Sequence, residues 1–242
     1  MNMDVPRFLN AGEAALVVEF GSVVDPAISE LVLTYDAALQ AMNLPGLLET
    51  VPTYRSLMVH YDPLILSRDT LTSKLCEVQA VPPRSSQSST LWTMPCCYDP
   101  AFGEDIIYIA ETTAMTAERV VALHSAATYR VYMYGFAPGF TYLGGLPGEL
   151  AVSRRMTPRA PHPTNTVLVG GGLSLISTVS MPTGWWLVGR TPERMFSPER
   201  EPGFLVQVGD AIRFEAIDMT TFIQLEARVA AGEVVARQEL QR

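Results

Sequence analysis

Arginine is the residue whose placement in this sequence most clearly suggests chemistry. Residues 150–192 contain no Asp or Glu, yet they hold Arg154, Arg155, Arg159 and Arg190, in a chain whose formal net charge is -8. A guanidinium group is a planar fork that matches a carboxylate or a phosphate. The segment therefore predicts an anion-binding surface. The alternative is that these arginines pair with acidic residues from elsewhere in the chain or from a partner.

Aromatic residues are dense around the arginines. Phe136, Phe140 and Tyr142 precede them, and Trp185 and Trp186 follow most of them. Large aromatic side chains commonly line ligand pockets. They also fill barrel cores and mark subunit interfaces, so these two alternatives stay open.

His124 is the histidine with a candidate role. It shares one face of a predicted helix with Val120, Leu123 and Ala127. That face turns toward a core or a cleft, so His124 is either a structural histidine or a proton carrier at the rim of a pocket.

The sequence predicts no metal site. His60, His124 and His162 are far apart, and Cys96 and Cys97 are adjacent rather than spaced as metal or redox pairs are.

The glycine run at residues 170–172 lacks the Lys-Ser/Thr of a phosphate-binding loop, and no Gly-x-Ser-x-Gly motif of serine hydrolases occurs. The run is interpreted as a strand end or a bulge.

Composition narrows the class of protein. With 242 residues, 48% of them hydrophobic and 17% charged, the chain suits one large domain or two small ones. The acidic balance and the single lysine, Lys74, argue against a nucleic-acid partner. Three cysteines, two of them adjacent, favour a reducing cytoplasm, and we expect neither a signal peptide nor a membrane span.

Hydrophobic periodicity predicts two domains. Residues 1–80 show short strands at 8–9, 15–20 and 57–61, with helices after Asp25 and Ser67, which is typical of a small α+β domain. Residues 81–90, with two prolines and a Ser/Gln run, are the predicted linker. Residues 91–242 hold a helix beginning after Thr116 and many short strands separated by Gly and Pro, including one at 204–206, which indicates a sandwich or barrel.

These motifs, in this order, resemble the family of the B subunit of 5-oxoprolinase, also called KipI-like or allophanate hydrolase subunit 1. The matching stretches are residues 97–98, 123–125, 130–146, 154–159, 184–191 and 208–210. The resemblance extends over most of the chain. It implies an α+β N-terminal domain and a mainly-β, cyclophilin-like C-terminal barrel.

The resemblance also implies a function. Complexes of such a B subunit with its C and A subunits cleave 5-oxoproline, a small cyclic amide, to glutamate with ATP. Since the chain shows no nucleotide loop or nucleophile motif, we expect it to supply part of a shared site. ATP would bind to or with a partner subunit. Related domains process urea or allophanate, and KipI-like members inhibit a sensor histidine kinase, so these remain alternative functions.

On this basis we expect Arg155, Arg159 and Arg190 to bind the substrate carboxylate or a phosphorylated intermediate. His124 would be the candidate proton carrier. The pocket walls would be Phe136, Tyr142 and Trp185. Residues 164–178 depart from the usual family pattern, so a difference in substrate is expected to arise there.

Overall fold

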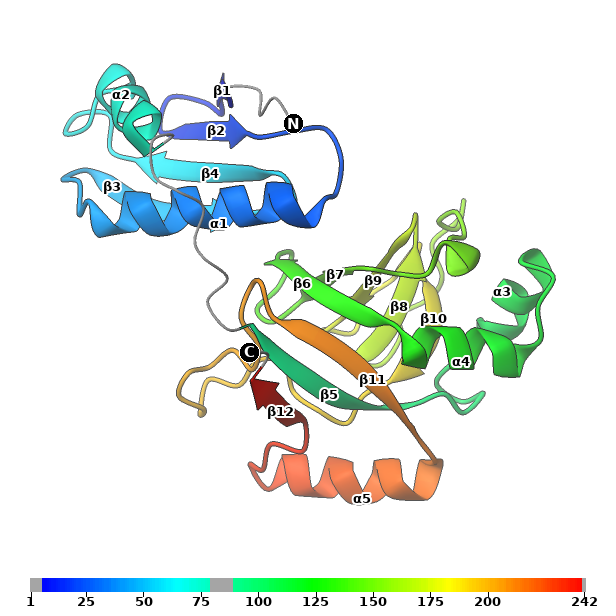
Figure 1. Cartoon of the computed structure of the whole chain (residues 1–242). Helices are drawn as coiled ribbons and strands as arrows, with labels where there is room; N and C mark the ends of the chain where they lie inside the picture. The colour runs from blue at the N-terminus through cyan, green and yellow to red at the C-terminus, as the bar shows by residue number, and fades with distance from the viewer. Residues whose placement is uncertain (1–5, 79–88, 241–242) are drawn as a thin grey trace. The chain divides into compact units, whose positions relative to one another are not determined.

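The computed structural model describes residues 6–78 and 89–240, which form two units (Figure 1). The first comprises Met1–Gln87 and the second Ser88–Arg242. Of the predicted linker 81–90, only the last two residues lie within the described part of the chain. The expected α+β N-terminal domain and mainly-β C-terminal barrel are both confirmed.

The first unit is an antiparallel sheet covered by helices. Its strands are β1 (Arg7–Asn10), β2 (Ala15–Glu19), β3 (Leu47–Pro52) and β4 (Ser56–Tyr61), in the spatial order β1-β2-β4-β3. Helices α1 (Pro26–Ala41) and α2 (Arg68–Val78) pack against it through one shared core. As predicted, Asp25 caps α1 by accepting from the N–H groups of Ala27 and Ile28.

Strand β3 was not predicted. It is an edge strand whose outward positions carry Leu48 and Glu49, both exposed, and it ends at Pro52. A proline is tolerated there because the outer edge of the sheet requires no ladder hydrogen bond. The same features hide the strand from a hydrophobic-periodicity analysis.

The second unit is a closed barrel of seven strands. They follow one another around the barrel as β10 (Trp186–Arg190), β8 (Thr166–Gly170), β9 (Leu173–Ile176), β7 (Thr141–Gly144), β6 (Thr128–Tyr134), β11 (Ala211–Ile217) and β5 (Thr90–Cys97). A bridge between Arg190 and Cys97 closes the ring. The C-terminal strand β12 (Arg237–Leu240) adds to β5 outside the ring.

The structure corrects one prediction about the barrel and refines another. Residues 204–206, predicted as a strand, form only an isolated bridge between Phe204 and Phe196. The glycine run 170–172 does mark a strand end: Gly170 is the last residue of β8, and Gly171 and Gly172, both with positive φ, form the two-residue hairpin turn to β9. That conformation, rather than crowding, requires glycine, because a side chain at either position would meet no neighbour.

Helices close the ends and sides of the barrel. They are α3 (Ile106–Thr112), α4 (Ala117–Ala126), the short 3-10 helix η1 (Gly148–Leu150) and α5 (Met219–Ala230). Thr116 caps α4 as predicted, by accepting from the N–H of Arg119. Figure 1 shows α4 at the end of β6 and α5 running beneath β5 and β11.

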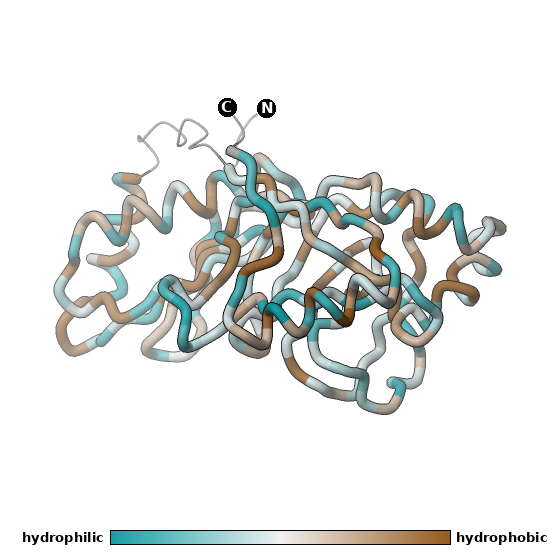
Figure 2. Tube along the Cα trace, turned by 90° about the horizontal axis from the view of Figure 1, so that it is seen from below, coloured by the Kyte–Doolittle hydropathy of each residue, from teal (hydrophilic) through white to brown (hydrophobic). Residues whose placement is uncertain are grey.

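Hydrophobic residues occur in short runs that alternate with hydrophilic ones along the trace of both units (Figure 2). Within residues 6–78 and 89–240, no helix combines the length and the apolar character that crossing a bilayer requires.

Candidate functional site

The arginine-bearing loop, residues 153–163, is hydrogen-bonded along residues 181–184, with one isolated β-bridge between Arg159 and Thr183. The N–H of Arg155 donates to Gly184 O at 2.8 Å, and that of Arg159 donates to Thr183 O at 2.8 Å. Further along, His162 N–H donates to Met181 O at 3.3 Å. The prolines at 158, 161 and 163 prevent a helix, so these backbone hydrogen bonds fix the loop.

Asp105 anchors this loop to the barrel. Its carboxylate accepts from Arg155 Nη1 at 3.3 Å and Arg159 Nη1 at 3.0 Å. It also accepts from the backbone N–H of Leu187, in β10, at 2.8 Å. Glu104 forms a second ion pair with Arg159. Asp105 therefore joins α3, β10 and the arginine loop at one point.

These contacts determine whether Arg155 and Arg159, two of the predicted anion ligands, are available to bind an anion. Burial works to lower the pKa of Arg159, but the hydrogen bonds and charges of Glu104 and Asp105 raise it above its usual range. Arg155 additionally stacks on Trp186, with its guanidinium carbon 4.5 Å from the ring centroid. Both arginines thus already hold carboxylates, as the alternative interpretation expected. A substrate anion would have to displace those carboxylates.

Arg190, the third predicted anion ligand, lies elsewhere on the barrel. Its Nη2 pairs with Glu226 of α5 at 2.9 Å, and its Nε donates to Thr164 O at 3.0 Å. The guanidinium lies over the rings of Phe102 and Phe222. It ties α5 to the end of β10, apart from the Asp105 cluster.

The predicted aromatic walls do gather. Along β8, Val167 and Val169 face the main barrel core, whereas Leu168 belongs to a second apolar cluster. Alternation along a strand places these two sets on opposite faces of the barrel wall. The second cluster comprises Phe140, Leu168, Leu175, Trp185 and Leu187, with Tyr142 packed against it.

Phe136 lies at the exposed end of this cluster. Its ring centroid is 5.3 Å from that of Phe140, which is 5.4 Å from that of Tyr142. Phe136 is 70% exposed, an unusual position for a large aromatic side chain, and its φ is +69°. The backbone therefore holds Phe136 in a conformation that non-glycine residues seldom adopt. We refer to Phe136, Tyr142 and Trp185, together with Arg154, as the aromatic surface.

Arg154 supplies the positive charge of this surface. Its guanidinium carbon lies 4.5 Å from the ring centroid of Trp185. It also lies close enough to Tyr142 to oppose the rise that burial causes in the pKa of that phenol. Among the described residues, Arg154 forms neither an ion pair nor a side-chain hydrogen bond, and it is exposed. It is the arginine of the loop that can bind a new anion.

The sequence pattern included Arg154 in the basic segment, but the predicted anion ligands were its neighbours. Arg154 and Arg155 are consecutive in an extended segment, so their side chains leave on opposite sides. Only one of them can reach Asp105. The adjacent pair was the available signal, but the position of Asp105, 50 residues upstream in the chain, decides which arginine turns inward.

His124 is a core residue. It is fully buried, its Nδ1 lies 2.8 Å from Tyr98 Oη, and its ring stacks on Phe214. Burial lowers the pKa of His124 to about 3, so the ring stays neutral at physiological pH. It does not lie at a pocket rim where it could exchange protons with a substrate, and its geometry fits the structural alternative.

No group of three or more potential metal ligands occurs among residues 6–78 and 89–240. The cysteines are free thiols, with Cys96 and Cys97 buried and Cys76 exposed.

Comparison with known proteins places this geometry in a family. The family model for the carboxyltransferase domain, subdomain C and D, matches residues 6–206. A Bacillus subtilis protein named as the B subunit of 5-oxoprolinase is 29% identical over 220 residues, which is 85% of this chain and 90% of that protein. The Escherichia coli O157:H7 protein of the same name is 31% identical over 207 residues, or 84% and 92% of the two chains.

Among solved structures, that of the protein TTHA0988 superimposes with a TM-score of 0.75 at 33% identity. The match covers 84% of this chain but 40% of that longer one. The resemblance to B subunits of 5-oxoprolinase is therefore confirmed, and the chain belongs to the family of the carboxyltransferase domain, subdomain C and D.

Proposed function

We propose that this chain is the B subunit of a 5-oxoprolinase-type complex, and that its aromatic surface forms part of the site for a small cyclic amide that carries a carboxylate. One observation carries the proposal. Over more than four-fifths of its length, the chain aligns with nine-tenths of two proteins named as B subunits of 5-oxoprolinase. The similarity therefore involves almost the whole of those proteins rather than one shared domain.

The aromatic surface suits this class of substrate. Arg154 offers an unpaired guanidinium to the carboxylate, and the partly exposed ring of Tyr142 offers an apolar face to a five-membered lactam ring. Trp185 is 8% exposed and supports Arg154, whose guanidinium lies over its ring. Burial raises the pKa of Tyr142, so its phenol stays protonated at neutral pH. Phe136, already exposed, would cover the ring from the side.

Arg155 and Arg159 have a supporting role in this proposal. Their ion pairs with Asp105 and Glu104 hold the loop so that Arg154 lies over Trp185.

The same ion pairs affect where ATP can bind, because a triphosphate needs several unpaired cations or a glycine-rich loop. The described part of this surface offers Arg154 alone, so it does not fit the nucleotide, and we assign ATP to the A and C subunits.

The test is reconstitution. The purified chain is combined with its A and C subunits, and ATP hydrolysis is measured with and without 5-oxoproline. We expect turnover that depends on 5-oxoproline and on this chain. Absence of such turnover, or equal stimulation by urea, would reject the proposed substrate. Inhibition of a sensor histidine kinase by the chain alone would favour the KipI-like alternative.

Two variants locate the site. Replacing Arg154 with Gln removes the proposed carboxylate ligand, and we expect KM for 5-oxoproline to rise about tenfold, the typical value of a charge-assisted hydrogen bond. The matched control is Arg119→Gln, which removes the same charge from an exposed position on α4. If both variants behave alike, the aromatic surface is not the substrate site.

A further inference from the structure

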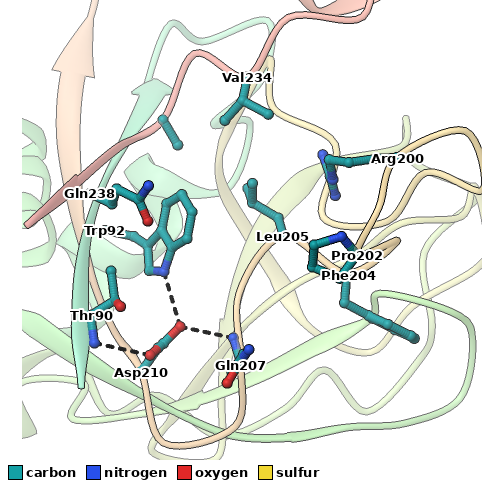
Figure 3. A pocket seen from close by; sticks show the side chains of 11 residues that line it. Thr90, Trp92, Arg200, Pro202, Phe204, Leu205, Gln207, Asp210, Val234 and Gln238 are labelled. Carbon is teal, nitrogen blue, oxygen red and sulfur yellow. Dashed lines mark hydrogen bonds between the residues drawn. The ribbon is translucent and has the colours of Figure 1, made fainter. Parts of the chain in front are cut away.

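A separate cavity of about 450 Å³ lies between the barrel and its C-terminal strand (Figure 3). One wall comes from β5 through Thr90 and Trp92, and another from β12 and the segment before it through Val234, Ala236 and Gln238. The loop from Arg200 to Gln207 and the residue Asp210 complete the lining. The volume falls in the usual range for small-molecule sites, about 300–1,000 Å³. None of these residues belongs to the aromatic surface or the Asp105 cluster.

Buried carboxylates hold the walls of this cavity in place. Asp210 accepts from Thr90 N at 3.0 Å, Trp92 Nε1 at 3.0 Å and Gln207 N at 2.9 Å. Glu193, which is fully buried, accepts from Val235 N at 2.7 Å and Ala236 N at 2.9 Å. The first carboxylate fixes β5 to the loop, and the second fixes the segment before β12. The cavity is therefore formed before any ligand enters.

Arg200 brings a positive charge to the cavity. Its Nη2 donates to the carbonyl oxygens of Arg194, Met195 and Gly203, while its buried Nε has no partner among the described residues. Glu199 and Glu233 line a smaller hollow beside it, but neither forms an ion pair with Arg200. Carbonyl dipoles thus hold the guanidinium in place without neutralising its charge.

Asp210 brings a negative charge to the lining, and that charge, unlike the charge of Arg200, is already offset. Asp210 is 9% exposed and already accepts three N–H donors, which offset its charge. In Figure 3 the labelled side chain of Leu205 lies between Asp210 and Arg200. The charge in the cavity that lacks an oppositely charged partner is therefore that of Arg200. An anion could bind there, next to the apolar surfaces of Leu205, Val234 and Trp92.

From this arrangement we propose that the cavity is a second binding site, which takes a small carboxylic acid with an apolar body. The carboxylate pairs with the guanidinium of Arg200, and the hydrocarbon part lies between Trp92, Leu205 and Val234. The site is independent of the proposed amide-hydrolase function, and it can be tested on the chain by itself.

Straight-chain carboxylates from acetate to octanoate, with hexanol and hexylamine as uncharged and cationic counterparts, serve as probes. Two-dimensional NMR of the full chain follows the indole N–H groups, of which the sequence has three. We expect hexanoate to shift the Trp92 resonance and leave those of Trp185 and Trp186 in place. Affinity should rise with chain length, by up to about fourfold per methylene group. Hexanoate should bind at least about tenfold more tightly than hexanol or hexylamine.

Two variants test the two halves of the site. Arg200→Gln should weaken hexanoate binding about tenfold or more, whereas Arg119→Gln, on α4, should leave it unchanged. Because Arg200 also holds backbone carbonyls, its loss could disturb the loop. Val234→Trp avoids this problem, since Val234 is 42% exposed and the larger side chain would fill the cavity while Arg200 stays intact. It should abolish the hexanoate-induced shift at Trp92.

The proposal is overturned if hexanoate and hexanol bind alike, if hexylamine binds better, or if the Trp92 resonance does not respond. It is also overturned if binding survives Val234→Trp, because the ligand would then lie elsewhere.

Discussion

Replacing Asp105 with Asn should destabilise the barrel, because Asp105 anchors the arginine loop, residues 153–163, to it. The substitution keeps the shape of the side chain but removes the negative charge shared by Arg155 and Arg159. The Asp105 side chain is 12% exposed, and those of the two arginines are 29% and 19% exposed, so the pairs are largely shielded from water. The new amide also places N–H donors where only acceptors are needed.

The magnitude follows from the contacts. A hydrogen bond to a charged partner contributes about 1.5–3 kcal/mol, and Asp105 makes two with arginines. The arginines keep some solvent contact, and Arg159 keeps Glu104, so we reduce the sum to about 2–3 kcal/mol in the free energy of unfolding. Asp105→Ala should cost about 1 kcal/mol more, because Leu187 N–H also loses its acceptor.

Urea unfolding followed by tryptophan fluorescence measures this loss of stability in the barrel unit itself. All three tryptophans, at positions 92, 185 and 186, lie in the barrel unit, so their emission is insensitive to unfolding of the first unit. The control is Glu104→Gln, since Glu104 is 49% exposed and should cost less than about 1 kcal/mol. Equal losses for the two variants, or an Asp105→Asn loss below about 0.5 kcal/mol, would refute the role of Asp105 as the anchor.

Two further predictions concern the barrel core. The folded-state pKa of His124 is lowered to about 3, so between pH 6.5 and 3 the unfolded chain binds a proton here that the folded chain does not. The free energy of unfolding of the wild type should therefore fall as the pH falls through that window, by up to about 1.4 kcal/mol per pH unit. The His124→Gln variant should lack this contribution, which a comparison of unfolding free energies from pH 7 to 4 would measure. A methyl group at Gly189 would lie 2.7 Å from Cys96 Sγ, so Gly189→Ala should lose about 1–3 kcal/mol in urea unfolding. Gly148→Ala, which meets no neighbour, should stay within about 0.5 kcal/mol of wild type; a loss equal to that of Gly189→Ala would contradict the crowding argument.

Most elements of the fold could be predicted from local signals in the sequence. The cap at Asp25, the helix after Thr116 and most of the short Gly/Pro-bounded strands are decided by residues close in the chain, and these appear as expected. Strand β3 was missed because its register is irregular between Leu47 and Glu49, so that the consecutive residues Leu48 and Glu49 are both exposed and the alternation is lost. The prediction of a strand at residues 204–206 was wrong because an apolar run can pack into a core without a partner strand.

The site was harder to predict because charge pairing is non-local. Whether an arginine can bind a ligand depends on whether a carboxylate reaches it first. For Arg155 and Arg159 that carboxylate comes from about 50 residues upstream, and for Arg190 it comes from α5, 36 residues downstream. The aromatic residues were easier to group, because they are dense in two stretches of the sequence, and Trp185 and Tyr142 from these stretches meet at one apolar cluster.

The segment 164–178, which we expect to depart from the usual family pattern, has a definite place in the structure. It forms the β8–β9 hairpin, and its side chains alternate between two apolar clusters. Val167 and Ile176 face the barrel core, where volume and shape must be kept for the barrel to close. Leu168 and Leu175 face the other way and lie in one cluster with Trp185. A change of residue on this second side alters the support of the aromatic surface without altering the barrel interior. We therefore propose that Leu168 and Leu175 are positions at which the substrate surface could differ between family members while the family fold is retained.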